Sequence, residues 1–247
     1  MPLLAILLAL LGAIVGSFLA TVVVRWPEGR SVTAGRSRCD GCGRALRAWE
    51  LVPLLSGLAA RGRCGACGGR IDPAHGRVEL ACLLVGAGAG LVAPWPEAAA
   101  GAVFGWLLVA LAALDLRHFW LPDRLTLPLA LAGLASAAAA PPELTDRLIG
   151  GAAGFASLWL IARGYRLARG RDGMGGGDPK LFGAIGLWLG WRMLPSVLLL
   201  AGLLGLGIVL FRRLTGRAVA CDDALPLGAL LAAAAYPAWL AMIGFAP

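Results

Sequence analysis

The chain has 247 residues, of which 59% are apolar and only 15% are charged, and its mean hydropathy is +0.79. This balance excludes an ordinary soluble domain and indicates an integral membrane protein. The formal net charge of +8 comes from 21 arginines and one lysine clustered between apolar runs, a pattern typical of membrane topology and lipid-headgroup contact and not of nucleic-acid binding.

An uncharged run from Pro2 to Val24 is long enough for one helix across about 30 Å of hydrocarbon. A cleaved signal peptide is the alternative, but the run is longer than the apolar part of such a peptide and lacks a basic segment before it. We expect residues 1–24 to form a retained first transmembrane helix.

Residues 25–77 change abruptly to a polar segment with ten arginines and four of the six cysteines. These cysteines form two C-x-x-C pairs, Cys39/Cys42 and Cys64/Cys67, with 21 residues between the pairs. That spacing is close to that of a four-thiolate structural zinc site, and the glycine after each second cysteine eases the turn. Two disulfides are the alternative, but they need an oxidising compartment, whereas the arginine excess indicates the cytoplasmic side. We expect a zinc-ribbon-like cytoplasmic insert, stabilised by the metal because its core is small.

Seven further apolar runs lie in residues 78–247 and, with the first, predict about eight transmembrane helices. The run Leu181–Trp191 is short for a crossing and can instead be half of a re-entrant hairpin. Tryptophans near run ends, among them Trp120, Trp188 and Trp191, are expected in an interfacial belt. The expected fold is an all-α polytopic membrane protein with the zinc insert between helices 1 and 2. The seven runs are Val78–Ala93, Ala98–Leu114, Leu125–Ala140, Leu148–Ala162, Leu181–Trp191, Met193–Phe211 and Ala224–Gly244.

Two aspartates stand at the edges of these runs, where ionisable residues are often functional. Asp178 follows a glycine-rich stretch whose Gly175, Gly176 and Gly177 allow a peptide to approach closely, and Asp115 opens the segment Asp-Leu-Arg-His-Phe-Trp-Leu-Pro-Asp. The alternation of the loops places both on the cytoplasmic side. Helix capping is one alternative for Asp178, since proline follows it. Two carboxyls that share a proton, however, can activate water and polarise a peptide carbonyl, as in aspartic proteases.

Together these residues resemble the type IV prepilin leader peptidases, bacterial inner-membrane aspartic proteases that also methylate the new N-terminus. The resemblance covers nearly the whole chain. Its residues are Gly16-Ser17-Phe18, the paired C-x-x-C insert, Val78-Glu79, the segment Asp115–Asp123 and the glycine motif before Lys180-Leu181.

The resemblance implies that Asp115 and Asp178 are the catalytic pair, supported by Gly175 and Gly177. Asp123 looks more like a helix-initiating cap, although it can also line the site, and Lys180 can either stabilise an ionised Asp178 or lie at the headgroup level. The implied substrate is a prepilin or pseudopilin precursor, cleaved at the cytoplasmic face of the inner membrane by direct attack of water.

S-adenosylmethionine is the implied methyl donor, and Glu50 and Glu79 are candidate contacts for it. The chain departs from the family pattern at Ala20, at Leu51-Val52-Pro53 and at His75-Gly76, all in or beside the insert, which puts methylation in doubt more than proteolysis. The sequence does not indicate an oligomeric state.

Two other functions are compatible with parts of the sequence. Asp115 and Asp178 could relay protons or ions in a transporter, although both lie at one membrane face and not near the middle of the bilayer. A non-catalytic assembly factor could use the zinc insert to recruit a cytoplasmic partner, with the aspartates as helix caps.

Overall fold

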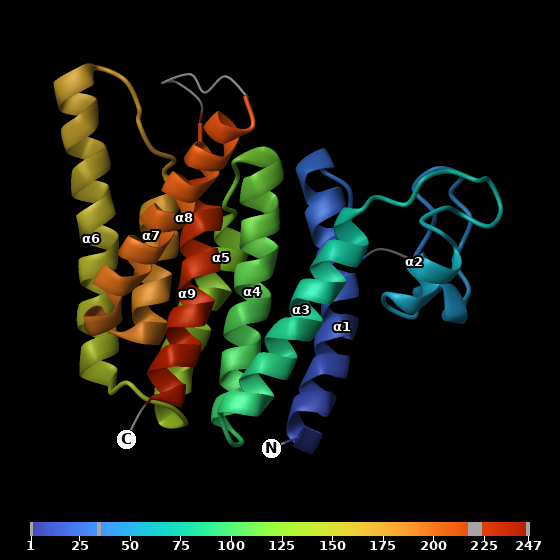
Figure 1. Cartoon of the computed structure of the whole chain (residues 1–247), viewed down its shortest axis with the longest axis horizontal. Coiled ribbons are helices and arrows are strands. Elements are labelled where there is room, and N and C mark those ends of the chain that lie inside the picture. The colour runs from blue at the N-terminus through green and yellow to red at the C-terminus, as the bar shows by residue number, and fades with distance from the viewer. Residues whose placement is uncertain (1, 34–35, 217–223, 246–247) are drawn as a thin grey trace. The chain divides into compact units, whose positions relative to one another are not determined.

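The computed structural model describes residues 2–33, 36–216 and 224–245. These residues fold into helices, and the described ranges contain no strand, only two isolated β-bridges inside the insert. The predicted all-helical fold is confirmed. The α-helices are α1 (Pro2–Arg25), α2 (Leu55–Ala59), α3 (Ala74–Val92), α4 (Glu97–His118), α5 (Asp123–Ala135), α6 (Leu144–Arg169), α7 (Gly177–Leu189), α8 (Leu194–Leu214) and α9 (Leu227–Gly244) (Figure 1).

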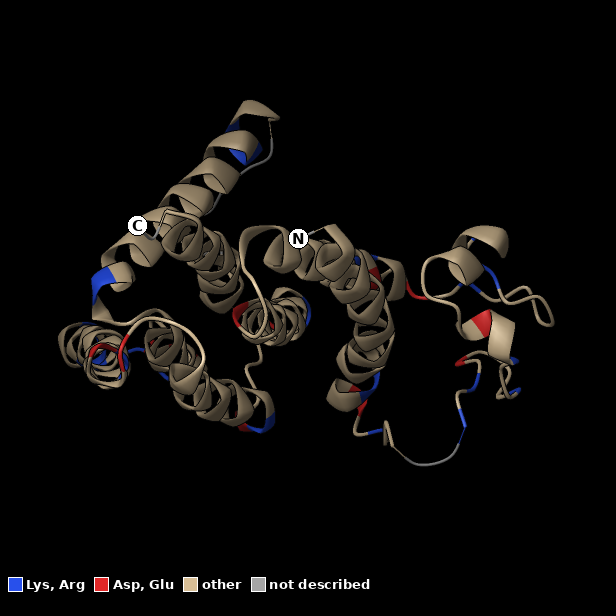
Figure 2. Ribbon diagram, turned by 90° about the horizontal axis from the view of Figure 1, so that it is seen from below, with Lys and Arg blue, Asp and Glu red and all other residues tan. Residues whose placement is uncertain are grey.

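The helices divide into two compact units, Met1–Ala113 and Leu114–Pro247. The first contains α1, the insert, α3 and most of α4, and the second contains the end of α4 and the helices α5 to α9. In both units the helices carry few charges along their length, and many charges gather at helix ends and in the insert (Figure 2). This distribution keeps charged groups away from the hydrocarbon layer.

Five of the described helices are long and apolar enough to cross a membrane, so the protein is a multi-pass membrane protein. They are α1, α3, α4, α8 and α9, with short extensions at the ends of α1 and α8. Helices α5, α6 and α7 occupy the other three predicted runs, but α5 and α7 have only 13 residues each. At about 1.5 Å per residue such a helix covers about 20 Å, less than a bilayer core.

In the first unit, α1 and α3 pack side by side and antiparallel, at a distance set by glycines (Figure 1). A Cβ added to Gly86 would lie 2.0 Å from the carbonyl oxygen of Leu8, and one added to Gly12 would lie 2.2 Å from that of Cys82. Side chains at these positions would separate the backbones. The spacing Gly12-x-x-x-Gly16 on α1 and Gly86-x-x-x-Gly90 on α3 is the small-residue pattern by which membrane helices approach closely.

In the second unit, α7 is the central helix and contacts α5, α6 and α9. Ten of its 13 residues are buried, which explains why a helix too short to span can be so apolar. Its contact with α6 again depends on glycines, because Cβ atoms on Gly150 and Gly186 would each lie within 2.5 Å of the other helix's carbonyl oxygen. Trp188 of α7 is 2% exposed and its indole donates to the Leu129 carbonyl at 2.7 Å, so its predicted interfacial position is wrong.

A buried arginine ties three helix ends of the second unit together, which the sequence did not predict. Arg147, near the start of α6, is 1% exposed and donates hydrogen bonds to one hydroxyl and five carbonyl oxygens. Its acceptors lie at the C-terminal ends of α5 and α7 and in the loop after α5, where helix carbonyls lack partners within the helix. They belong to Gly133, Ser136, Ala140, Pro141, Pro142 and Leu187.

Candidate active site and metal centre

The second unit brings Asp115 and Asp178 together. Asp115 is in the last turn of α4 and Asp178 in the first turn of α7, and they are 4% and 6% exposed. Their carboxyl groups interact electrostatically, and the backbone N–H of Gly228 lies where it can donate a hydrogen bond to either of them. Two carboxyls this close in a buried site disfavour double ionisation, so the arrangement can hold one shared proton.

The N-terminus of α9 contacts the two aspartates. Asp115 Oδ2 accepts the backbone N–H of Ala229 at 2.7 Å, and Gly228 precedes it in the first turn of α9. The first N–H groups of a helix lack partners within the helix and carry partial positive charge, so they stabilise a carboxylate. Sequence reasoning missed both residues, since it treated Ala224–Gly244 only as a membrane run. The Pro226-Leu227-Gly228 stretch at its start was the available signal.

Glycines around the pair leave room that side chains would fill. A Cβ on Gly228 would lie 3.0 Å from Asp115 Oδ2, one on Gly175 would lie 3.3 Å from Asp178 Oδ2, and one on Gly177 would lie 2.7 Å from Leu121 Cβ. Gly176 has no neighbour within 4 Å of such a Cβ, so it does not share this packing constraint. A side chain would therefore meet neighbouring atoms at Gly175 and Gly177 but not at Gly176.

Asp123 and Lys180 form a separate, exposed pair. Lys180 Nζ contacts both carboxylate oxygens of Asp123 at 2.8 and 2.9 Å, and their side chains are 49% and 67% exposed, respectively. Lys180 thus pairs with Asp123 and not with Asp178. The N-cap of α5 is Pro122, with no side-chain capping bond, so the prediction that Asp123 caps the helix is wrong. Asp178 is likewise not an N-cap, because Gly176 holds that position in α7.

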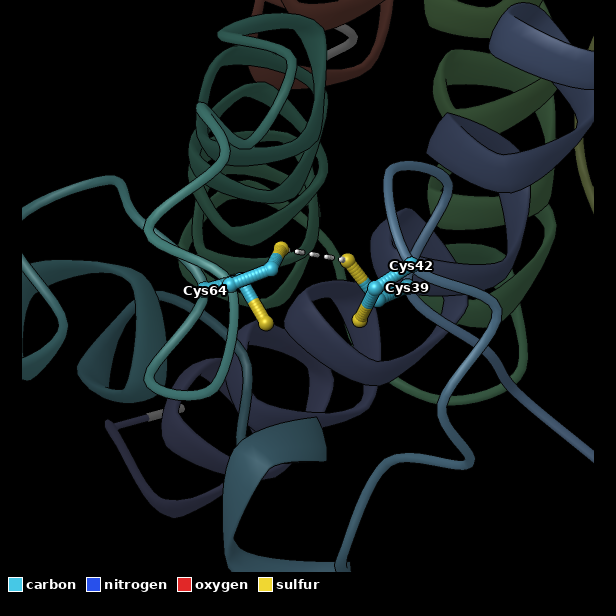
Figure 3. Close-up of side chains that lie close together, drawn as sticks. Cys39, Cys42 and Cys64 are labelled. Atoms are coloured by element: carbon cyan, nitrogen blue, oxygen red, sulfur yellow. Dashed lines mark hydrogen bonds between the residues drawn. The ribbon is translucent and has the colours of Figure 1, made fainter.

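The four cysteines of the insert converge as the spacing predicts. The sulfur atoms of Cys39, Cys42, Cys64 and Cys67 all lie within 4.8 Å of one another, with 3.9 Å between Cys39 and Cys67. Figure 3 shows Cys39 and Cys42 of the first pair facing Cys64 of the second. A tetrahedral zinc ion with Zn–S bonds of about 2.3 Å requires sulfur atoms roughly 3.8 Å apart. Backbone N–H groups of Cys67 and Ala66 also lower the pKa of Cys64 to about 6, which favours the thiolate that binds metal.

Each of the two cysteine pairs forms its own turn, and the two turns are of the same type. In each, the first cysteine's carbonyl accepts the N–H of the glycine after the second cysteine, at 2.9 Å, and these glycines, Gly43 and Gly68, have φ of 71° and 69°. Only glycine adopts this left-handed conformation without strain. The prediction that these glycines ease the turns is therefore confirmed.

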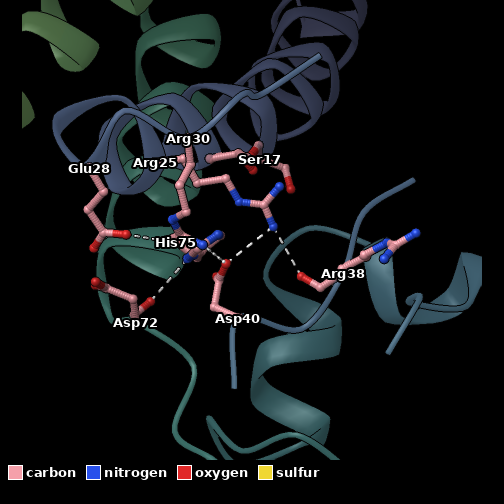
Figure 4. A network of polar contacts seen from close by, with 9 residues as sticks. Ser17, Arg25, Glu28, Arg30, Arg38, Asp40, Asp72 and His75 are labelled. Atoms are coloured by element: carbon pink, nitrogen blue, oxygen red, sulfur yellow. Dashed lines mark hydrogen bonds and ion pairs between the residues drawn. The ribbon is translucent and has the colours of Figure 1, made fainter. Parts of the chain in front are cut away.

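Ion pairs hold the insert to the end of α1 and close it internally. Asp40, between the first two cysteines, contacts Arg25 at 3.3 Å and Arg30 at 2.7 Å (Figure 4). Glu50 accepts two hydrogen bonds from Arg44, which lower the pKa of its carboxyl to about 2, and a third from the Arg47 N–H. Both oxygens of Glu50 are therefore already engaged inside the insert.

Glu79, the other candidate contact, lies on α3 and is 8% exposed. Its Oε2 accepts the N–H of Leu54 from the insert at 2.8 Å. Both candidate glutamates line the space between the insert and the α1–α3 pair, but they differ in their contacts: Arg44 and Arg47 engage both oxygens of Glu50, whereas the Leu54 N–H engages one oxygen of Glu79.

Comparison with known proteins finds two family models that match successive parts of the chain. The model of the type IV leader peptidase family matches residues 102–210, and that of the bacterial peptidase A24 N-terminal domain matches residues 10–92. No solved structure matches the chain.

Curated relatives are similar along most of their length. A prepilin leader peptidase/N-methyltransferase of Burkholderia pseudomallei (strain 1026b) is 40% identical over 90% of this chain and 81% of that protein. Proteins of the same name from Stutzerimonas stutzeri and Pseudomonas putida are 36% and 35% identical, over 97% and 96% of this chain and 91% and 89% of their own lengths. With this identity and coverage, the chain belongs to the type IV leader peptidase family.

Proposed function

We propose that this protein is a membrane-embedded aspartic endopeptidase that removes the leader from type IV prepilins or pseudopilins and then N-methylates the new N-terminus. The observation that carries the peptidase is the meeting of two buried aspartates over the first turn of α9. The names of the relatives, which combine both activities, support the pairing of peptidase and methyltransferase.

In the proposed mechanism, Asp115 and Asp178 share one proton. The ionised carboxyl takes a proton from water as the water attacks the scissile carbonyl, and the protonated carboxyl hydrogen-bonds the carbonyl oxygen. The N–H groups of Gly228 and Ala229 stabilise the ionised form. Peptide cleavage then proceeds without an acyl-enzyme. Gly175 and Gly177 support this geometry by leaving space at Asp178 and Leu121.

Zinc is the metal we propose for the four cysteines, because the spacing of their sulfur atoms fits a tetrahedral ion. Bound zinc stabilises the insert, which has few buried apolar side chains of its own. S-adenosylmethionine is the methyl donor that the methyltransferase activity requires, and it supplies an electrophilic methyl group when bound.

We also propose that the protein lies in the bacterial inner membrane, with α5, α6 and α7 embedded beside the five helices that are long and apolar enough to cross it, giving about eight passes. The insert, the two aspartates and the arginines at the end of α6 then share the cytoplasmic side. An embedded short helix such as α7 is feasible because its surface is covered by α5, α6 and α9.

Incubating a purified prepilin with the solubilised protein and S-adenosylmethionine tests this function by the mass of the product. We expect loss of the leader followed by addition of one methyl group. If the prepilin stays intact while the protein conducts ions in liposomes, the two aspartates serve transport and the peptidase proposal is wrong.

A further inference from the structure

A large open cavity lies between the insert and the α1–α3 pair in the first unit, with a volume of about 1300 Å³. One side of the cavity is apolar and exposed: Phe18 of α1, Leu80 of α3 and Leu58 of α2 line it and are 52%, 47% and 74% exposed. Polar groups from the end of α1 and from the insert form its other side (Figure 4). The cavity is therefore amphipathic, and its size exceeds that of one small molecule.

One carboxylate of this cavity differs from the others. Glu79 is buried in the wall, with Oε2 held by the Leu54 N–H, and no described residue forms a hydrogen bond with its Oε1. Among the described lining residues Glu79 is the one buried acid, whereas the other four are half-buried or exposed and are engaged by arginines or backbone N–H groups. These are Glu28 with Arg30, Asp40 with Arg25 and Arg30, Glu50 with Arg44 and Arg47, and Asp72 with Ala74.

A buried carboxylate with a free oxygen beside apolar walls fits a ligand that joins a cation to an apolar chain. We propose that this cavity binds the N-terminus of the processed pilin, with its α-ammonium group on Glu79 and its following apolar side chains against Phe18, Leu80 and Leu58. The inference rests on the methyltransferase half of the proposed function and assigns that activity to a site built entirely within residues 14–80.

Glu79 acts on the amine in this site. The α-ammonium gives a proton to the Glu79 carboxylate, which passes it to water, and the neutral nitrogen then forms a bond to the donor methyl carbon. The carbon–sulfur bond breaks, its electron pair stays on sulfur, and S-adenosylhomocysteine leaves. The product is a secondary ammonium, which the carboxylate still stabilises by charge.

The first test compares Glu79→Gln with Glu28→Gln by the methylated fraction of product that has already lost its leader. Glutamine keeps an acceptor for the Leu54 N–H but removes the charge, and Glu28 is an acid of the same cavity whose side chain is 58% exposed. We expect Glu79→Gln to lower the methylated fraction at least about tenfold, as loss of a charge-assisted hydrogen bond does, and Glu28→Gln to leave it unchanged. Equal fractions in both variants and in the wild type would overturn the inference.

Equilibrium dialysis with labelled S-adenosylmethionine separates the two cations that Glu79 could bind. An unchanged dissociation constant in Glu79→Gln assigns the carboxylate to the amine. A clearly raised constant assigns it to the donor's sulfonium and contradicts the proposal.

Photocrosslinking tests the cavity without depending on methylation. Benzoylphenylalanine in place of Phe18 should capture the first residues of the mature pilin, whereas the same group at Leu84, which is 60% exposed on α3 outside the cavity, should not. If the wild-type protein cleaves but never methylates, capture by the variant with benzoylphenylalanine at position 18 would remove the methyltransferase from the proposed function and keep the binding site. Equal capture at both positions, or none at Phe18, would refute the site.

Discussion

Replacing Gly228 by alanine probes the contact between α9 and the two aspartates. The added Cβ would lie 2.7 Å from Leu121 Cδ1 and 3.0 Å from Asp115 Oδ2, whereas ordinary contacts begin at 3.4 Å. The leucine must therefore shift by about 0.7 Å and the carboxyl oxygen by about 0.4 Å. Such a shift disturbs the 2.7 Å bond between the Asp115 carboxyl and the Ala229 N–H.

A hydrogen bond to a charged group contributes about 1.5–3 kcal/mol, which corresponds to roughly 10- to 150-fold in rate if it is lost only in the transition state. We expect Gly228→Ala to lower kcat for leader removal within that range. Gly207→Ala on α8 is the control, because its Cβ meets no atom within 4 Å and the residue lies outside the glycine motif, and it should cleave at nearly the wild-type rate.

The assay is single-turnover cleavage of a fluorescent prepilin in detergent, with thermal unfolding measured on the same samples. If Gly228→Ala and Gly207→Ala cleave equally fast while both are folded, then the first turn of α9 does not support the carboxyl pair.

Other changes test the remaining structure. Gly86→Ala should destabilise the α1–α3 pair by about 1–3 kcal/mol, because its Cβ would lie 2.0 Å from a carbonyl oxygen of α1. Gly76→Ala on the same helix is the control, since its Cβ would meet no atom within 4 Å. Thermal unfolding distinguishes the two variants, and equal melting temperatures would refute the close packing. Arg147→Leu should cost at least about 3 kcal/mol, since it leaves several buried carbonyls unpaired, and a denaturant series that shows no loss would contradict this role. Glu50→Gln should speed zinc release to a chelator at pH 7, because it removes the ion pair with Arg44. Arg44 lowers the pKa of Glu50 from 4.5 to about 2, so the stability from this ion pair is fully present above pH 4.5 and is lost as the pH falls towards 2. An unchanged rate of release would show that the Arg44–Glu50 pair does not support the insert.

The features that the sequence predicted are those determined by neighbouring residues. The Cys-x-x-Cys-Gly pattern specifies a turn of five residues, so Gly43 and Gly68 could be assigned their role before the structure was known. The apolar runs likewise predicted the positions of the helices. The glycine motif and the two aspartate segments identified Asp115 and Asp178 through a family resemblance, but their proximity required the fold.

The features that the sequence did not predict depend on distant contacts. Ala229 is 114 residues from Asp115, and Arg147 is 40 residues from its acceptor Leu187, so no local pattern links them. Lys180 pairs with Asp123 across 57 residues, although Asp178 is only two residues away. The buried position of Trp188 could not be predicted for the same reason, because an aromatic residue near the end of an apolar run lies in the protein core when other helices cover it.

The central claim is that Asp115 and Asp178 cleave the leader as a pair, and the most direct test compares Asp115→Asn, Asp178→Asn and Asp123→Asn in the cleavage assay. Asparagine keeps the shape of each side chain but cannot share the proton. We expect both Asp115→Asn and Asp178→Asn to lose leader removal and Asp123→Asn, which breaks only an exposed ion pair, to retain it. Cleavage by a folded Asp115→Asn or Asp178→Asn protein at the wild-type rate would contradict the account.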